Sequence, residues 1–378
     1  MRHFPKHGLN VPLITILDEA GQVIAADQRR VIRHVWQEGY GADVIFANGT
    51  TGEWNRLANS ERQRLLEIAV DEVKCIRQQA AVHVGPLPEI WLGVNGATRA
   101  EVLSNLDLAI QLGADADVIA PLAIDDLADT DIPGFFRREL NDLLETARPP
   151  LPIFLYDNAD INALSRDKTQ AHIGAQVMRE LSRLPWVCGL KVSAPRHILE
   201  QYAQAVLPFK QPGEFGLYVG NANLIFDWFR PCEGRLASGH IPVGVVAGPA
   251  NVLPREWQKA WRVCQAGDEE LIGLYQEIAA AFERLTVFNS MDQANQDTGK
   301  MIACLKTALA LDGLISADGV ALGTPRLTES ERTRFQQGYA ELKNTISGRI
   351  APRWQTITAL PKAARRPQNA LSELSLQT

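Results

Sequence analysis

Lys191 is the residue in this sequence whose setting most strongly suggests covalent chemistry. It stands in a short apolar run, 188–193, where a buried strand is expected, and buried lysines are rare unless they are paired. An apolar site disfavours the ammonium form, so the amine would be partly neutral and nucleophilic near neutral pH. This chemistry is that of a Schiff base with a carbonyl substrate. The hexapeptide alone favours the plainer alternative, a lysine whose stem packs while its head reaches water.

Residues 49–54, Gly-Thr-Thr-Gly-Glu-Trp, form a second candidate site. Two glycines around Thr50 and Thr51 permit unusual backbone angles and present several amide N–H groups in a row, which suits a carboxylate or a phosphate. The threonine hydroxyls add donors and can relay a proton. A tight structural turn whose threonines cap a helix explains the same residues equally well. Glu53 is expected to hold its own loop by hydrogen bonds.

Tyr156 closes the apolar run 152–156 and is followed by Asp157. A phenol, with a reference pKa of about 10, can pass a proton to and from a carbinolamine when hydroxyls lie beside it. A buried core tyrosine with one satisfied hydroxyl is the ordinary alternative. Asp157 can either orient a substrate hydroxyl or cap its loop. Asn251, near the end of the pattern, is expected to hold a loop by side-chain hydrogen bonds.

Eight short apolar runs alternate with helical patterns between about residues 10 and 250, which predicts an α/β fold of the (β/α)8 TIM barrel type. The expected strands are 13–17, 43–47, 90–94, 117–120, 152–156, 189–193, 216–220 and 243–247. Tyr156 and Lys191 would then lie near the carboxyl ends of neighbouring strands, where such barrels keep their chemistry. An open doubly wound sheet is disfavoured, because it calls for a glycine-rich turn after the first strand.

The chain is expected to divide into three parts. The barrel would occupy residues 1–253, and a small C-terminal helical region, 254–347, would pack on it. The helices expected there are 254–267, 268–287, 297–311 and 328–346. A tail over 348–378, rich in proline and arginine, is expected to be irregular.

The composition excludes several classes of function. Charged residues make up 22% of the chain and the net charge is −6, so no basic surface for nucleic acid is expected. No apolar run approaches the roughly 18 residues that cross a membrane, and the first residues lack the apolar core of a signal peptide. Five scattered cysteines without metal or redox spacing indicate reduced, mostly buried thiols and a cytoplasmic protein.

These separate motifs occur in one order that closely resembles the dihydrodipicolinate synthase / N-acetylneuraminate lyase superfamily of class I aldolases. The motifs are Gly-Thr-Thr-Gly-Glu at 49–53, Tyr156, Gly-Leu-Lys at 189–191, Gly220, and the stretch 244–251. The resemblance covers about residues 10 to 345. The ordered set is specific, whereas no single motif is.

The resemblance implies roles for particular residues. Lys191 would form the Schiff base with pyruvate or another 2-oxo acid, Tyr156 and Thr51 would relay protons, and the loop holding Thr50 and Thr51 would bind the substrate carboxylate. Gly220 and Val246 would complete the substrate site, and Asp157, which departs from the superfamily pattern, is placed there as a residue that can orient a substrate hydroxyl. No cofactor, metal, nucleic acid or membrane partner is implied, and the expected assembly is a homo-oligomer, a tetramer built from dimers.

Two departures argue against true dihydrodipicolinate synthase activity. Members of the superfamily commonly have Tyr-Asn-x-Pro after strand five, whereas this chain has Tyr-Asp-Asn-Ala at 156–159. The synthase has an arginine in that loop for its second substrate, and this chain has none between 157 and 164. The synthase also has a tyrosine after the proline that ends strand four, and here Leu122 follows Pro121. Both losses leave the Schiff-base residues intact.

Three hypotheses follow. The first is a Schiff-base lyase, aldolase or dehydratase that acts on pyruvate or a larger, sugar-derived 2-oxo acid; a genuine dihydrodipicolinate synthase is its variant. The second is a barrel that binds a keto acid for regulation without turning it over. The third, a metal-dependent aldolase, is disfavoured because the seven histidines do not fall at strand ends in a ligand pattern.

Overall fold

The computed structural model describes most of the chain. The described residues are 5–79, 87–113, 116–119, 124, 127–147, 151–162, 171–211, 213–228, 242–288 and 300–350. Of the tail expected over 348–378, residues 348–350 belong to a π-helical turn, Ile346–Ile350, rather than to an irregular segment, and the part from residue 351 onward lies outside the described residues.

Eight parallel strands close into a barrel in sequence order, which confirms the predicted fold. They are β1 (Gly8–Pro12), β2 (Val44–Ala47), β3 (Glu89–Gly93), β4 (Ala116–Ile119), β5 (Ile153–Asn158), β6 (Val187–Ser193), β7 (Gly216–Val219) and β8 (Gly244–Val246). Seven of the predicted strands overlap these elements.

The first predicted strand, 13–17, was wrong, because the barrel strand is β1, one strand length earlier. Residues 13–17 are as apolar as a strand and equally buried, so hydrophobicity alone could not separate them. Beyond β1, side chains supply the partners that a neighbouring strand would have offered. The Ile14 amide donates to Asn251 Oδ1 at 3.0 Å and the Ile16 amide to Gln28 Oε1 at 3.0 Å.

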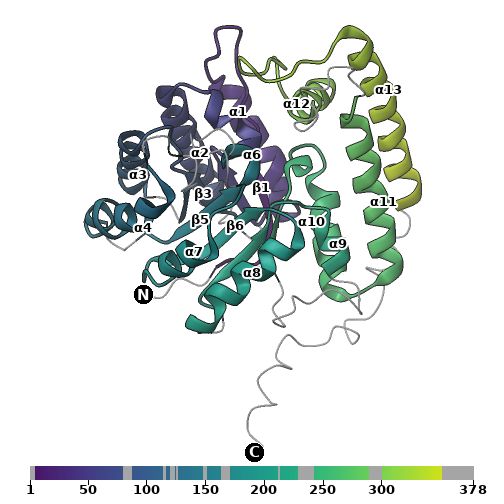
Figure 1. The fold of residues 1–378 in the computed structure, drawn as a ribbon. Coiled ribbons are helices and arrows are strands. Elements are labelled where there is room, and N and C mark those ends of the chain that lie inside the picture. Colours follow the sequence, from purple (N-terminus) through teal and green to yellow (C-terminus); the bar gives the residue numbers. More distant parts are fainter. Residues whose placement is uncertain are drawn as a thin grey trace, which may run out of the picture.

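Helices surround the barrel, as Figure 1 shows. The longer ones are α1 (Ala25–Trp36), α2 (Asn59–Gln79), α3 (Arg99–Leu112), α7 (Ala175–Ser182) and α8 (Arg196–Val206). The shorter ones are α4 (Ile132–Phe135), α5 (Asn141–Leu144), α6 (Ala159–Asn162) and α9 (Leu224–Trp228). Their apolar faces and the outer faces of the strands form one continuous core.

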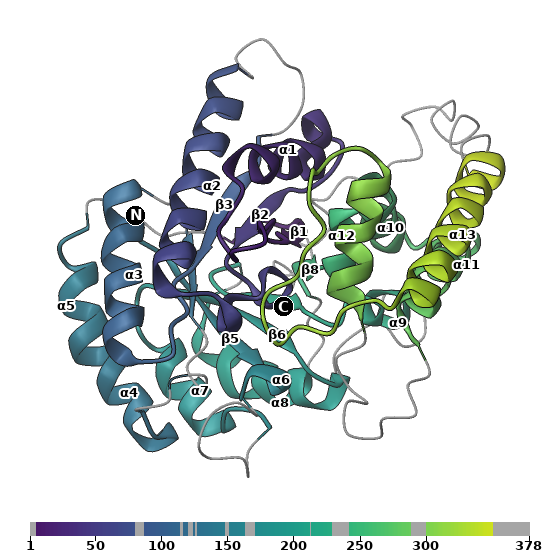
Figure 2. The same ribbon diagram turned by 90° about the horizontal axis from the view of Figure 1, so that it is seen from above.

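A helical region follows the barrel, as predicted. It consists of α10 (Pro254–Ala266), α11 (Glu269–Thr286), α12 (Met301–Leu311) and α13 (Glu329–Thr345). In Figures 1 and 2, α11 and α13 run side by side, and α12 lies on the side that faces the barrel. Thr328 and Glu331 form a capping box at the start of α13. The proposed domain limit at residue 253 stays a prediction.

An aromatic layer closes the lower interior of the barrel. The rings of Trp91 and Phe154 stack with their centroids 3.8 Å apart. Tyr218 packs edge-on against both, at 4.7 and 5.4 Å. Alternate strands supply such layers in (β/α)8 barrels, and the pairing register places these three residues at one level.

The levels above this aromatic layer carry the polar chemistry. Because the register climbs by about one residue per strand, the next level toward the carboxyl ends contains Phe46, Lys191 and Val246. The level above that contains Tyr156 and two glycines, Gly93 and Gly220. A glycine there leaves room for the stem of Lys191, since a Cβ at Gly220 would lie 3.0 Å from Lys191 Cε.

Candidate active site

Lys191 projects from β6 into the barrel and is 5% exposed. Its Nζ lies 2.7 Å from Ser193 Oγ and 4.2 Å from the centroid of the Tyr156 ring. Among the described residues, the neighbours of Nζ are therefore a hydroxyl and a ring face rather than a carboxylate. Polar contacts with these two side chains therefore hold the buried amine in the barrel mouth.

Tyr156 shares a hydrogen-bonding group with residues from two other places in the chain. Its phenol oxygen contacts Thr50 Oγ1, and either oxygen can be the donor. Asn158 Nδ2 donates to both oxygens, at 3.4 Å to the phenol and 3.3 Å to the threonine hydroxyl. Tyr156 is 1% exposed, so these contacts operate away from bulk water. The three side chains form a path along which a proton can move between hydroxyls.

The loop over residues 49–53 approaches this group as a single 3-10 turn, Thr50–Gly52. Asn48 and Glu53 bracket the turn, and both adopt the left-handed conformation with φ of 61°. A Cβ on Gly52 would lie 2.8 Å from the Leu13 carbonyl oxygen, so glycine is required there. Thr15 Oγ1 donates to the Gly52 carbonyl at 2.7 Å and holds the turn against the chain that follows β1.

Thr51 and Val246 lie toward β8. A Cβ placed on Gly248 would be 3.3 Å from Thr51 Oγ1, so the threonine side chain reaches the end of that strand. Val246 belongs to the apolar cluster inside the barrel, together with Phe46 and Tyr156. The structure thus brings together, around one barrel mouth, all the predicted site residues except Asp157.

Known proteins resemble this chain in sequence and in fold. The model of the dihydrodipicolinate synthetase family matches residues 5–85. A 4-hydroxy-tetrahydrodipicolinate synthase from Staphylococcus saprophyticus is 26% identical over 303 residues, which is 80% of this chain and 86% of that protein. The N-acetylneuraminate lyase of Homo sapiens is 29% identical over 194 residues, which is 50% of this chain and 54% of that protein.

Solved structures share the fold of this chain. The dihydrodipicolinate synthase from Bacteroides thetaiotaomicron superposes with a TM-score of 0.70 at 20% identity, over 90% of this chain and 99% of the other. YagE, a prophage protein of the dihydrodipicolinic acid synthase family from E. coli K12 solved in complex with pyruvate, gives a TM-score of 0.69 at 18% identity, over 89% and 98% of the two chains.

In sequence and in fold, the chain is similar to proteins of the dihydrodipicolinate synthase / N-acetylneuraminate lyase superfamily. The curated relatives are lyases of this superfamily, which supports a lyase-like function here.

Asp157 faces away from the group around Lys191, although we expected it among the substrate-binding residues as a group that could orient a substrate hydroxyl. It follows Tyr156 on β5 and so points to the other side of the strand. Its carboxylate accepts hydrogen bonds from Asn162 Nδ2 at 2.6 Å and Tyr202 OH at 2.7 Å, and lies 2.9 Å from His172 Nδ1. These contacts tie the chain after β5 to α8. A direct contact with substrate would need the carboxylate on the opposite face.

The sequence reasoning missed two residues near Lys191, namely Ser193 and Asn158. Each lies two positions after a residue that was singled out, Lys191 and Tyr156. Because strand side chains alternate between faces, a polar residue at that spacing enters the same mouth. The signal was therefore present in the sequence, and the loop substitutions after strand five obscured it.

Cys188 is three residues before Lys191 but is no nucleophile. Burial raises the pKa of its thiol well above the usual value, so the thiol stays protonated. It packs in the barrel cluster as a small apolar residue. Burial likewise raises the pKa of the Tyr218 phenol in the aromatic layer, which keeps it neutral.

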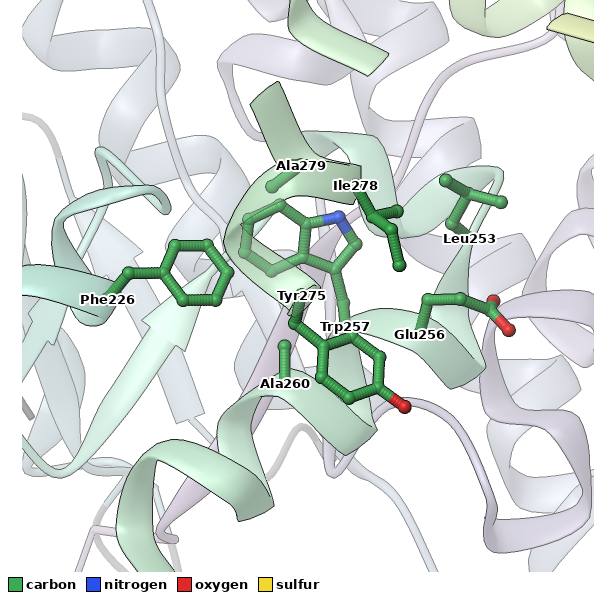
Figure 3. Close-up of a pocket in the computed structure, with 8 residues that line it drawn as sticks. All are labelled: Phe226, Leu253, Glu256, Trp257, Ala260, Tyr275, Ile278 and Ala279. Atoms are coloured by element: carbon green, nitrogen blue, oxygen red, sulfur yellow. The ribbon is translucent and has the colours of Figure 1, made fainter. Parts of the chain in front are cut away.

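An apolar crevice lies away from this mouth, between α9, α10 and α11 (Figure 3). None of the candidate site residues lines it. The lining residues are Phe226, Leu253, Glu256, Trp257, Ala260, Tyr275, Ile278 and Ala279. Elsewhere within the described ranges, no three His, Cys, Asp or Glu side chains gather as a metal site requires, and no helix there is both long and apolar enough to cross a membrane.

Proposed function

We propose that this protein is a Schiff-base-forming lyase, of the aldolase or dehydratase type, that acts on pyruvate or a larger 2-oxo acid. One observation carries the proposal: Lys191 Nζ is buried in the barrel mouth, 4.2 Å from the ring centroid of Tyr156, whose phenol contacts Thr50 Oγ1. A buried amine beside a hydroxyl relay is the arrangement that imine formation requires.

The proposed reaction begins with attack of the neutral Lys191 amine on the keto carbon. A C–N bond forms, and the keto oxygen takes a proton through Tyr156 and its hydroxyl partner Thr50, with Thr51 as the further relay group. The resulting carbinolamine then loses its oxygen as water and leaves an iminium. The amide groups of the turn at Thr50 and Thr51 bind the substrate carboxylate as a nest of donors.

The iminium acts as an electron sink. In cleavage, the hydroxyl on the fourth carbon loses its proton and this carbon leaves as an aldehyde, while the electron pair of the bond between the third and fourth carbons passes to the iminium nitrogen and forms an enamine. In dehydration, removal of a proton from the third carbon sends its electron pair to the same nitrogen, and the hydroxyl group then leaves the fourth carbon as water. Protonation of the enamine and hydrolysis then return the free amine and the keto acid product. Condensation is this sequence in reverse.

We propose that the substrate is a 2-oxo acid derived from a sugar acid. The second substrate of the true synthase is not expected to bind. Arginine is absent from 157–164, where that synthase carries one, and the carboxylate of Asp157 already binds side chains of this chain. The proposal includes a homo-oligomer, a dimer or tetramer, which light scattering of the purified protein would test.

Borohydride reduction in the presence of pyruvate tests the imine directly. Trypsin normally cleaves after Lys191, so a reduced pyruvyl adduct should appear as an uncut peptide over residues 184–196. Lys191→Met keeps a stem of similar length without the amine, and Lys191→Arg keeps the charge without a usable amine. Both variants should show no adduct and a loss of activity of at least about a thousandfold.

Other outcomes point elsewhere. Adducts with longer 2-oxo acids but not with pyruvate would identify a sugar-acid enzyme. A keto acid that raises the melting temperature without any adduct at Lys191 would overturn the proposal in favour of a non-catalytic binding barrel. Full activity of Lys191→Met would exclude the mechanism altogether.

A further inference from the structure

The carboxylate of Glu53, the last residue of the Gly-Thr-Thr-Gly-Glu motif, is bound by the C-terminal region rather than by its own loop. Its Oε2 lies 2.7 Å from Lys306 Nζ on α12. Its Oε1 accepts the Ala321 amide at 2.8 Å and the Thr324 hydroxyl at 2.6 Å. The sequence predicted that Glu53 would hydrogen-bond within its loop, so all three of these partners were missed.

The ion pair is fully enclosed, because both Glu53 and Lys306 are 0% exposed. Lys306 Nζ also donates to the Gly319 carbonyl at 2.7 Å. Burial lowers the pKa of Lys306, and the nearby Glu53 carboxylate offsets only part of this effect. Desolvating two charges is costly, and truncating one of them leaves the other buried and unpaired. The pair therefore holds its two segments in a single arrangement.

Residues 314–324, which we call the strap, lie between α12 and α13. They include Ala321 and Thr324, which donate to Glu53 Oε1. Figure 2 shows the chain leaving α12, turning near α1 and returning to α13. The strap is anchored to α1 as well, since Ser316 Oγ donates to Asp27 at 2.7 Å and Arg30 Nε to the Leu314 carbonyl at 2.9 Å. Hydrogen bonds to α1 and to Glu53 therefore fix the strap at both ends.

Glu53 needs such support because its backbone is in the left-handed conformation, φ 61°, which is unfavourable for a residue with a Cβ. The Glu53 amide donates to the Thr50 carbonyl at 2.9 Å and closes the turn that carries both threonines. Holding the Glu53 carboxylate from behind therefore fixes where Thr50 Oγ1 meets the Tyr156 phenol.

We propose that Glu53 and Lys306 are positioning residues, through which α12 and the strap set the geometry of the threonine turn at the barrel mouth. The inference rests on the proposed function for its kinetic consequence. It makes the C-terminal helical region part of the active site: the turn that binds the substrate carboxylate is held in place from α12, at a distance from the reacting amine.

The test compares Lys306→Met with Lys343→Met in the full chain. Lys343 lies on α13 and pairs with Asp312, just after α12, at 2.5 Å. It does not contact the threonine turn. Lys306→Met should raise KM for pyruvate by roughly tenfold or more and lower kcat less, because a misplaced turn weakens carboxylate binding first. Lys343→Met should leave both constants within about twofold, as expected for a half-exposed pair.

A second readout needs no substrate. Hydrogen–deuterium exchange of the peptide over residues 48–57 should be faster in ligand-free Lys306→Met than in the wild type, and unchanged in Lys343→Met. If the wild-type protein forms no adduct with any keto acid, the proposed function fails, yet this exchange comparison still decides whether α12 holds the turn.

Thr324→Val covers the case in which Lys306→Met does not fold. It removes one of the three donors to Glu53 and leaves no charge unpaired, so the same changes should appear at smaller size. A folded Lys306→Met or Thr324→Val protein with wild-type KM and wild-type exchange over 48–57 would overturn the inference.

Discussion

At the scale of single residues, the site depends on what surrounds one amine and one phenol. Lys191 has the Ser193 hydroxyl at 2.7 Å and the ring of Tyr156 beside it. The phenol in turn contacts Thr50, and Asn158 donates to both oxygens. A hydrogen-bonded relay of this kind works only if its members stay aligned, because proton transfer requires short, directed contacts.

Asn158→Ala tests this alignment. The change removes the amide that bridges the phenol and the threonine hydroxyl, so kcat should fall by roughly tenfold to a hundredfold while borohydride still traps the imine at Lys191. Asn158→Asp should do no better, because a carboxylate cannot donate. Asn223→Ala, which removes a hydrogen bond to Glu283 on α11, is the control. Wild-type turnover in Asn158→Ala would show that the amide has no part in the relay.

At the scale of elements, two neighbouring strands set the site. Tyr156 and Lys191 are direct pairing partners in β5 and β6, and the period of two along each strand adds Asn158 and Ser193 to the same mouth. The end of β7 contributes a position without a side chain. Gly220, just after it, lies so close to β6 that any side chain there would strike Ser193 and the stem of Lys191.

Gly220→Ala should therefore abolish most of the chemistry, because β6 and the side chains of Ser193 and Lys191 would have to shift. The new Cβ would lie 2.2 Å from Ser193 Oγ, 2.8 Å from the Val192 carbonyl oxygen and 3.0 Å from Lys191 Cε, and the backbone atom cannot move aside cheaply. Adduct yield should fall at least about tenfold in the trapping assay. Gly273→Ala in α11, where nothing lies within 4 Å of the new Cβ, is the matched control. Equal adduct yields in the two variants would contradict this account of Gly220.

At the scale of the whole molecule, the barrel and the C-terminal helices bury thiols that can report on unfolding. Burial raises the pKa of Cys264 on α10 and of Cys304 on α12, each to about 12. At pH 8, which lies below both values, only about one thiol in ten thousand would be ionised, and only the thiolate reacts.

Cys264 and Cys304 should accordingly resist alkylation at pH 8 in the native protein, whereas the part-exposed Cys75 reacts. Labelling of the two buried thiols should begin only at denaturant concentrations that unfold the chain, and mass mapping of the labelled peptides measures it. Their rapid labelling in the native state would mean that α10 or α12 opens locally.

The sequence by itself determined the architecture and the chemical character of the mouth. Repeated apolar runs alternating with helical stripes specify the barrel, since parallel strands covered on both faces must be apolar throughout. Chain order alone placed Tyr156 and Lys191 on adjacent strands. The start of β1 could not be read in this way, because residues 13–17 are as apolar and as buried as the strand before them.

Only the tertiary structure decided which face each polar residue serves and which distant segments meet. Asp157 and Asn158 are neighbours in the chain, yet one binds Tyr202 of α8 and the other the relay. Glu53 and Lys306 are 253 residues apart and form a buried pair. Local patterns report hydrophobicity and backbone preference, whereas a contact across such a separation depends on how helices and strands pack. That packing joins the threonine turn to α12.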